Sequence, residues 1–242
     1  MTVALVVLLA TLVTATVSGV LGMAGGLLLM GALLLVLPAT TAFVVHGLLQ
    51  LVANGWRAVL HRAHVRWAVV AAYAVGSVVA LGALAVVAYT PDTAVTYLLL
   101  GLVPALVWLP KGWLPLDAER PSHAALAGLL TTGVNLVAGV SGPLLDVFFT
   151  RTGMPRHAIV ATKAATQVLA HTAKVVLYGG AAVSGAGVPW LVVALAVPLS
   201  MLGTALGGRL LDRMSDAGFL RATRWVVTAI GVSYLVQAAR IA

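Results

Sequence analysis

Two stretches of the chain place polar side chains at regular intervals within apolar sequence. Each set has intervals of four, four and three residues, and the two sets are His46, Gln50, Asn54 and Arg57, and Lys163, Gln167, His171 and Lys174. These intervals put each set along one face of a helix. Cationic, amide and imidazole groups dominate both faces, whereas cation transporters usually carry several buried carboxylates. The two faces therefore favour a small anion as the ligand.

Lys163 is costly to bury, because an ammonium inside a membrane span needs water, a counter-ion or a substrate beside it. Asp146 is the one nearby candidate for a counter-ion. The two residues are either a structural pair or parts of a site in which Asp146 is the counter-ion or coupling group. Arg57 and Lys174 lie near predicted helix ends, where long side chains can reach the membrane interface.

His46 and His171 carry imidazoles, which titrate near neutral pH and suit proton coupling. The alternative is that each is a hydrogen-bonded packing residue of a helix bundle. Asn135 and Ser141 border a glycine-rich turn, where they could donate to a ligand. Asparagine also joins membrane helices through hydrogen bonds, so both roles stay open for Asn135.

Glycine-rich motifs precede both polar stretches, with GMAGG at 22–26 and GVSGP at 139–143. We expect the chain to turn there inside the membrane, which glycine permits, and new helices to begin at Gly26 and Pro143. Two helix N-termini would then point at the midplane with free N–H groups and partial positive charge, which together form an anion site. Close packing of helices is the alternative, because small residues also let membrane helices touch.

The composition is that of an integral membrane protein. Hydrophobic residues make up 62% of the 242 residues and charged residues 8%, with a mean hydropathy of +1.09, which leaves too little polar surface for a soluble domain. Cytoplasmic loops of membrane proteins carry an excess of Lys and Arg, which accounts for the net charge of +8 of this chain. We therefore expect no nucleic acid partner. Cysteine is absent, as are the motifs of zinc proteases, serine hydrolases and P-loop proteins. We therefore expect no enzyme, metal or cofactor.

Charged clusters and Gly or Pro breaks divide the chain into ten predicted helices. They cover 3–21, 25–37, 41–57, 67–89, 93–109, 122–138, 143–151, 157–179, 188–210 and 219–240. A shift of 117 residues without gaps aligns both glycine motifs, the prolines that follow them, and Gln50 with Gln167. We interpret the chain as a single transmembrane domain of two homologous halves, 1–109 and 122–240, joined by the cytoplasmic loop 110–121.

Lys and Arg gather in four loops, which should face the cytoplasm. These loops are 57–66, 111–120, 151–156 and 209–224. The uncharged segment 179–188 takes the place of the first loop in the second half and should lie outside, with both termini. Equivalent loops on opposite faces predict inverted-topology repeats, with about eight full spans plus short hairpin arms. Such repeats are typical of secondary transporters, whose site lies near the midplane.

At these motifs the chain resembles the TauE/SafE family, the group of sulfite exporters and organosulfonate permeases. Each half opens with a Gly-rich hairpin turn, followed by a short apolar arm, a proline and a polar helix. The family's two turns fall on Gly22, Gly25 and Gly26, and on Gly139, Ser141 and Gly142. The sequence departs from the glycine-richer family pattern at Met23, Ala24 and Pro143. The resemblance implies a multi-pass protein of the cytoplasmic membrane that moves small sulfur oxyanions or sulfonates without an ATPase partner.

Three functions stay open. The leading one is a secondary transporter that moves sulfite, a sulfonate or a related anion across the bilayer through a site between the halves. An anion channel of the same architecture would pass currents independently of a proton gradient, and a membrane scaffold would move no anion. The direction of transport, the coupling ion and the existence of a homo-oligomer stay open as well.

Overall fold

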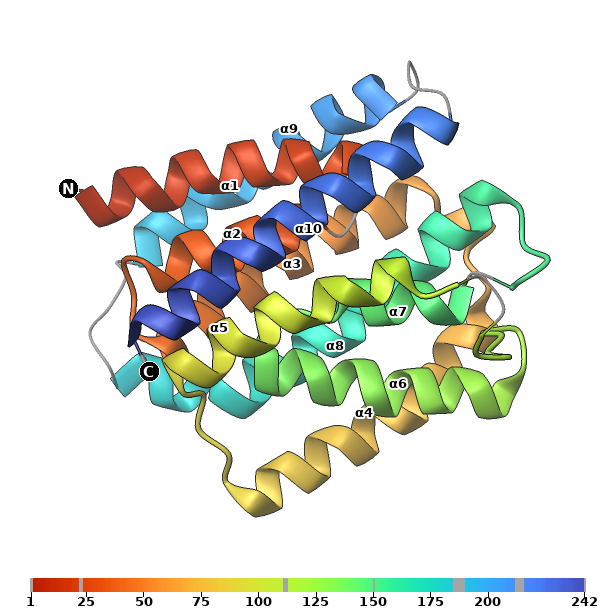
Figure 1. The fold of residues 1–242 in the computed structure, drawn as a ribbon, viewed down its shortest axis with the longest axis horizontal. Helices are drawn as coiled ribbons and strands as arrows, with labels where there is room; N and C mark the ends of the chain where they lie inside the picture. The colour runs from red at the N-terminus through yellow and green to blue at the C-terminus, as the bar shows by residue number, and fades with distance from the viewer. Residues whose placement is uncertain are drawn as a thin grey trace.

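The described part of the chain folds into α-helices without β-strands, as its apolar composition predicts (Figure 1). The structure, a computed structural model, describes residues 2–21, 24–110, 113–149, 151–184, 190–211 and 216–241. Its α-helices are α1 (Thr2–Leu21), α2 (Ala24–Leu34), α3 (Ala39–Leu60), α4 (Trp67–Val87), α5 (Thr93–Leu102), α6 (Pro121–Ala138), α7 (Gly142–Phe149), α8 (Arg156–Ser184), α9 (Trp190–Leu211) and α10 (Asp216–Ile241). Two 3₁₀ helices follow α3 and α5, and they are η1 (Arg62–His64) and η2 (Val103–Trp108).

The ten predicted segments correspond one to one to these α-helices. The main differences are at α5, which gives way to η2 around Pro104, and at α8, which continues to Ser184 rather than ending at residue 179. Among the described residues, α1, α3, α4 and α9 contain windows long and apolar enough to cross a membrane. The prediction of an all-helical, multi-pass membrane protein is confirmed. The number of eight spans and the inversion of the repeats stay predictions.

The short helix α2 lies in the middle of the protein (Figure 1). Leu27 and Leu33 are fully buried, and the Tyr234 hydroxyl of α10 donates a hydrogen bond to the Leu27 carbonyl. Eleven residues rise about 16 Å, so α2 reaches only part of the way across a membrane. Its first three residues, 24–26, are also buried. The N-terminus of α2 therefore lies inside the protein rather than at its surface.

The helices pack in pairs, with α1 on α9, α4 on α6, α3 on α8 and α5 on α10 (Figure 1). The central pair, α3 and α8, runs antiparallel. His46, in the first half of α3, lies beside His171, at the middle of α8, with ring centroids 5.5 Å apart. Ala58, near the end of α3, packs on the apolar cluster that contains Ala161, near the start of α8. This antiparallel pairing brings the two polar faces predicted from the sequence together.

Glycines let α4 and α6 cross closely. A Cβ atom added to Gly76 would overlap the carbonyl of Ala125, and one added to Gly128 would overlap the carbonyl of Tyr73. The Tyr73 hydroxyl forms a 2.6 Å hydrogen bond with the Thr131 hydroxyl across the same interface. Small residues thus bring the two backbones together, and hydroxyl groups join them, as is common between membrane helices.

The substitution Gly76→Leu should destabilise the protein by about 1–3 kcal/mol or more, because its side chain would enter the backbone of α6. Thermal unfolding in detergent measures this change. Gly82→Leu on the same helix is the control, because no atom lies within 4 Å of a Cβ added there. It should change the free energy of unfolding by less than about 0.5 kcal/mol. Equal losses in the two variants would contradict the close crossing.

Candidate functional site

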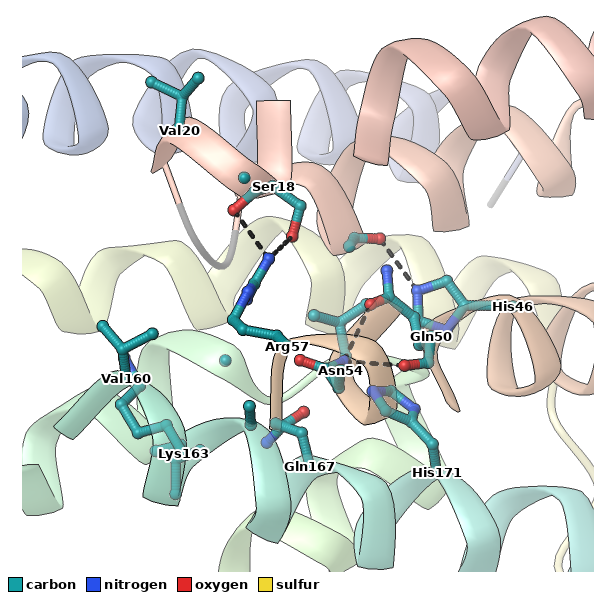
Figure 2. Close-up of a pocket in the computed structure, with 16 residues that line it drawn as sticks. Ser18, Val20, His46, Gln50, Asn54, Arg57, Val160, Lys163, Gln167 and His171 are labelled. Atoms are coloured by element: carbon teal, nitrogen blue, oxygen red, sulfur yellow. Dashed lines mark hydrogen bonds between the residues drawn. The ribbon is translucent and has the colours of Figure 1, made fainter. Parts of the chain in front are cut away.

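A cavity of about 160 Å³ lies where the polar faces of α3 and α8 meet (Figure 2). The end of α1 and the first turns of α2 and α7 complete its wall. The lining residues are Ser18, Gly19, Val20, Gly26, His46, Gln50, Asn54, Arg57, Val140, Gly142, Leu145, Val160, Lys163, Ala164, Gln167 and His171. Both polar faces predicted from the sequence therefore border one cavity.

Figure 2 shows that the polar side chains of the cavity are arranged in order along α3 and α8. Arg57 and Lys163 lie at one end, which we call the cationic end, and His46 and His171 lie at the other, which we call the histidine end. The amides of Gln50, Asn54 and Gln167 lie between them. Hydrogen-bond donors thus extend over the whole length of the cavity.

Arg57 and Lys163 have different partners at the cationic end. Arg57 Nη2 donates to the Ser18 carbonyl at 3.2 Å and approaches the Ser18 hydroxyl at 3.5 Å. Lys163 forms an ion pair with Asp146 of α7, and each of these two side chains is 28% exposed. Arg57 has no carboxylate partner within the residues that the structure describes. Arg57 shares one face of α3 with Asn54, and both side chains line the cavity. Arg57 therefore does not extend to the membrane interface.

His46 holds the histidine end in one arrangement. Its Nε2 lies 3.0 Å from the Gly26 carbonyl, which can only accept, so Nε2 carries the proton and donates it. Its Nδ1 accepts a 2.9 Å hydrogen bond from the Lys174 ammonium. Asn54 is held in the same helix, where its amide nitrogen donates to the Gln50 carbonyl at 3.0 Å and to Gln50 Oε1 at 3.1 Å. The polar face of α3 is therefore held by hydrogen bonds within the protein.

Lys174 does not reach the membrane interface, contrary to the interpretation from sequence. Its side chain is fully buried (0% exposed) behind the histidine end. Besides His46, its ammonium donates to Asn135 Oδ1 at 3.3 Å and to the Gly139 carbonyl at 2.7 Å. The sequence placed Lys174 near a helix end, but α8 continues ten residues farther, to Ser184. The ammonium therefore has to find its partners inside the protein.

The first turns of α2 and α7 both border the cavity, through Gly26 and Gly142. α2 begins at Ala24 and α7 at Gly142, close to the starting points predicted at Gly26 and Pro143. A Cβ atom added to Gly26 would lie 3.2 Å from Gln50 Nε2. Because the first four N–H groups of a helix lack partners within the helix and carry partial positive charge, both turns can attract an anion.

The other residues of the two motifs have different surroundings. Gly25 faces α1, where an added Cβ would overlap the Thr14 carbonyl. Gly139 ends α6 with a φ of +81°, which favours glycine, and an added Cβ would lie 2.9 Å from Met30 Cε. Ser141 is 1% exposed, and its hydroxyl has no hydrogen-bond partner in the described structure. Gly22 lies outside the described residues.

The end of α1 was not predicted as part of the site, although it contributes Ser18, Gly19 and Val20. Ser18 is a polar residue in the last turn of an apolar helix, four residues before the first glycine motif. This polar side chain was the sequence signal that could have assigned the end of α1 to the site. No cluster of His, Asp or Glu that could hold a metal ion occurs in the described part of the chain. The cavity therefore offers mainly cationic, N–H and amide donors, which suit an anion.

Comparison with known proteins agrees with these features. Residues 7–234 of the 242-residue chain match the family model described as sulfite exporter TauE/SafE. No curated protein and no solved structure shows a significant match. The family match spans both glycine motifs, both polar helices and every residue that lines the cavity. The chain therefore belongs to the TauE/SafE sulfite exporter family, a family of membrane transporters.

Proposed function

We propose that the protein is a secondary transporter of the cytoplasmic membrane that carries a small sulfur oxyanion or sulfonate, such as sulfite. We assign its substrate to the cavity between α3 and α8. One observation carries the proposal: two cationic side chains, three amides and two helix N-termini converge on a cavity that no carboxylate of the described residues lines. Asp146 is the ion-pair partner of one of the two cations, Lys163. Family membership supports a membrane transporter of sulfur anions.

The charges at the cavity support an anion rather than a cation. Arg57 brings a permanent positive charge with no carboxylate beside it in the described structure. Lys174 adds an ammonium behind the histidine end. Asp146 can neutralise only Lys163. An anion in the cavity would compensate the remaining charge and accept several charge-assisted hydrogen bonds.

The packing of the helices supports the inverted repeat. The shift of 117 residues relates α1 to α6, α3 to α8 and α4 to α9, and the order of the helices then pairs α5 with α10. Under this exchange the pair α1–α9 becomes α6–α4, and the pairs α3–α8 and α5–α10 become themselves. Each exchanged pair is one that packs in the structure. The antiparallel course of α3 and α8 is also the arrangement that an inverted repeat requires, and it favours a site on the axis between the halves.

The substitution Arg57→Gln should weaken anion binding about tenfold to a hundredfold, because a hydrogen bond to a charged group contributes about 1.5–3 kcal/mol. Purified protein in liposomes, tested with labelled sulfite, thiosulfate and methanesulfonate, would measure both binding and uptake. Arg62→Gln is the control, because Arg62 is exposed in η1 and does not line the cavity. Absence of uptake under every gradient would contradict the transporter, and steady anion currents would indicate a channel.

Substitutions at two neighbouring glycines should affect different properties, transport at Gly26 and folding at Gly25. Gly26→Ala would add a methyl group toward Gln50, whose flexible end can move, so we expect loss of transport with little loss of folded protein. Gly25→Ala would push a methyl group into the backbone of α1, so we expect mainly loss of folded protein. Transport per folded molecule and the thermal midpoint separate the two effects. If both variants lose transport only in proportion to folded protein, the first turn of α2 does not meet the anion.

The inverted topology can be tested with single cysteines, because the natural chain has none. We expect Ala63→Cys to be labelled by an impermeant reagent only from the cytoplasmic side and Ser184→Cys only from the outside. Each variant should be labelled both in intact cells and in inside-out vesicles. Labelling of both positions from the same side would contradict the inverted repeat.

A further inference from the structure

The ion pair at the cationic end occupies the ammonium that an anion in the cavity would contact. We propose that the Asp146 carboxylate competes with the transported anion for Lys163, and that a proton on Asp146 frees Lys163, so that each anion is carried together with one proton. This inference rests on the proposed function and adds to it the coupling ion.

The geometry of α7 places the competing carboxylate beside the anion site. Gly142 lines the cavity at the first turn of α7, and Asp146 lies four residues later, on the same face of the helix. Lys163 lines the cavity and is the partner of Asp146. Residue 146 lies about 6 Å farther along the axis of α7 than residue 142. The carboxylate and an anion in the cavity would then both be within reach of one ammonium.

The Asp146 carboxylate and the anion would compete for the Lys163 ammonium. Two negative groups beside one ammonium repel each other where little water screens them. Arg57, the other cation at this end, stays protonated, so its attraction for the anion does not change with pH. Asp146 is the only carboxylate that contacts a cavity-lining cation in the described part of the chain. Protonation of Asp146 removes the repulsion and releases Lys163 for the substrate.

The two histidines of the cavity are less suited to accept this proton. Both nitrogens of His46 are already used, one as donor to Gly26 and one as acceptor from Lys174. A further proton on His46 would break the bond with Lys174 and place two cations side by side. The His171 ring lies 5.5 Å from that of His46 and beside the Asn135 amide that also binds Lys174. A proton there would likewise add positive charge near a buried ammonium.

The remaining titratable groups on the elements around α7 and α8 do not line the cavity. Asp117 and Glu119 lie near the C-terminal end of α7, where the backbone N–H of Ala118 donates to the Phe148 carbonyl at 2.9 Å. His157 lies at the start of α8, beside His61, which follows α3, and His64 of η1. Tyr73 lies on α4 and His123 on α6. The helix η2, which packs on α7, has no titratable side chain. Among the carboxylates and histidines of the described residues, Asp146 is therefore the group best placed to take up a proton that acts on the anion.

The exchange conserves charge and protons. The Asp146 carboxylate accepts a hydrogen bond from the Lys163 ammonium. A proton from water binds an Asp146 oxygen, the ion pair opens, and the ammonium keeps its three protons and donates to the incoming anion. The charge of the added proton cancels that of a monovalent anion. Release of the anion and the proton on the other side restores the ion pair.

Methanesulfonate and thiosulfate are suitable probes, because their own charge stays constant between about pH 6 and about pH 8, where binding would be measured. If binding takes up one proton, the Kd of the wild-type protein should rise about tenfold per pH unit wherever Asp146 is ionised in the unloaded protein. Asp146→Asn should remove this slope and keep the Kd near its low-pH value. Asp117→Asn is the matched control, a carboxylate near α7 but outside the cavity, and should keep the slope.

A pH-sensitive dye inside liposomes gives a second measurement that needs no variant. Entry of methanesulfonate through the wild-type protein should acidify the lumen by one proton per anion. Binding and transport without pH dependence or proton movement would overturn the coupling and leave the transporter proposal intact. A pH slope that persists in Asp146→Asn would assign the proton to another group and overturn the inference. Failure of the wild-type protein to bind any anion would overturn the proposed function itself.

Discussion

Lys174 has to satisfy three N–H donors and a positive charge in an interior where none of the described residues places a carboxylate beside it. Its ammonium meets His46 of α3, Asn135 of α6 and the carbonyl of Gly139 at the end of α6. A helix C-terminus carries partial negative charge, so the Gly139 carbonyl is a favourable partner for a cation. One side chain thereby fixes the relative positions of three helices. The histidine end of the cavity depends on that arrangement, because Lys174 also determines which nitrogen of His46 carries a proton.

The cationic side chains at the two ends of the cavity differ in their partners and in their exposure. At the histidine end, the ammonium of Lys174 is bound entirely by neutral acceptors and is shielded from the cavity. At the cationic end, Arg57 and Lys163 border the cavity directly, and the Lys163 ion pair is partly exposed. Buried ion pairs hold together firmly only when both partners are well desolvated and fully hydrogen-bonded. A partly exposed pair beside a cavity is easier to open, which suits a group that exchanges its partner.

Glycine has two separate tasks in this protein. At Gly76 and Gly128 it lets α4 and α6 touch, and at Gly25 it lets α2 approach α1. At Gly26 the added space opens toward Gln50 and the cavity instead. Both roles depend on the absence of a side chain. In the first role two helix backbones come together, and in the second a backbone comes close to a ligand site. Membrane proteins combine these uses because exposed backbone groups are tolerated only beside protein or a polar cavity.

The sequence by itself determined the helical class, the ten helices and the two polar faces, because apolar composition and a 3.6-residue period act within each segment. The tertiary structure decided which polar residues meet. Arg57 and Lys174 occupy equivalent positions in the two polar sets, yet Arg57 borders the cavity and Lys174 lies buried against α6. Gly25 and Gly26 are adjacent, yet only Gly26 borders the cavity. Periodicity defines the face of one helix, whereas the partner of each side chain depends on how far neighbouring helices extend and at which residues they cross.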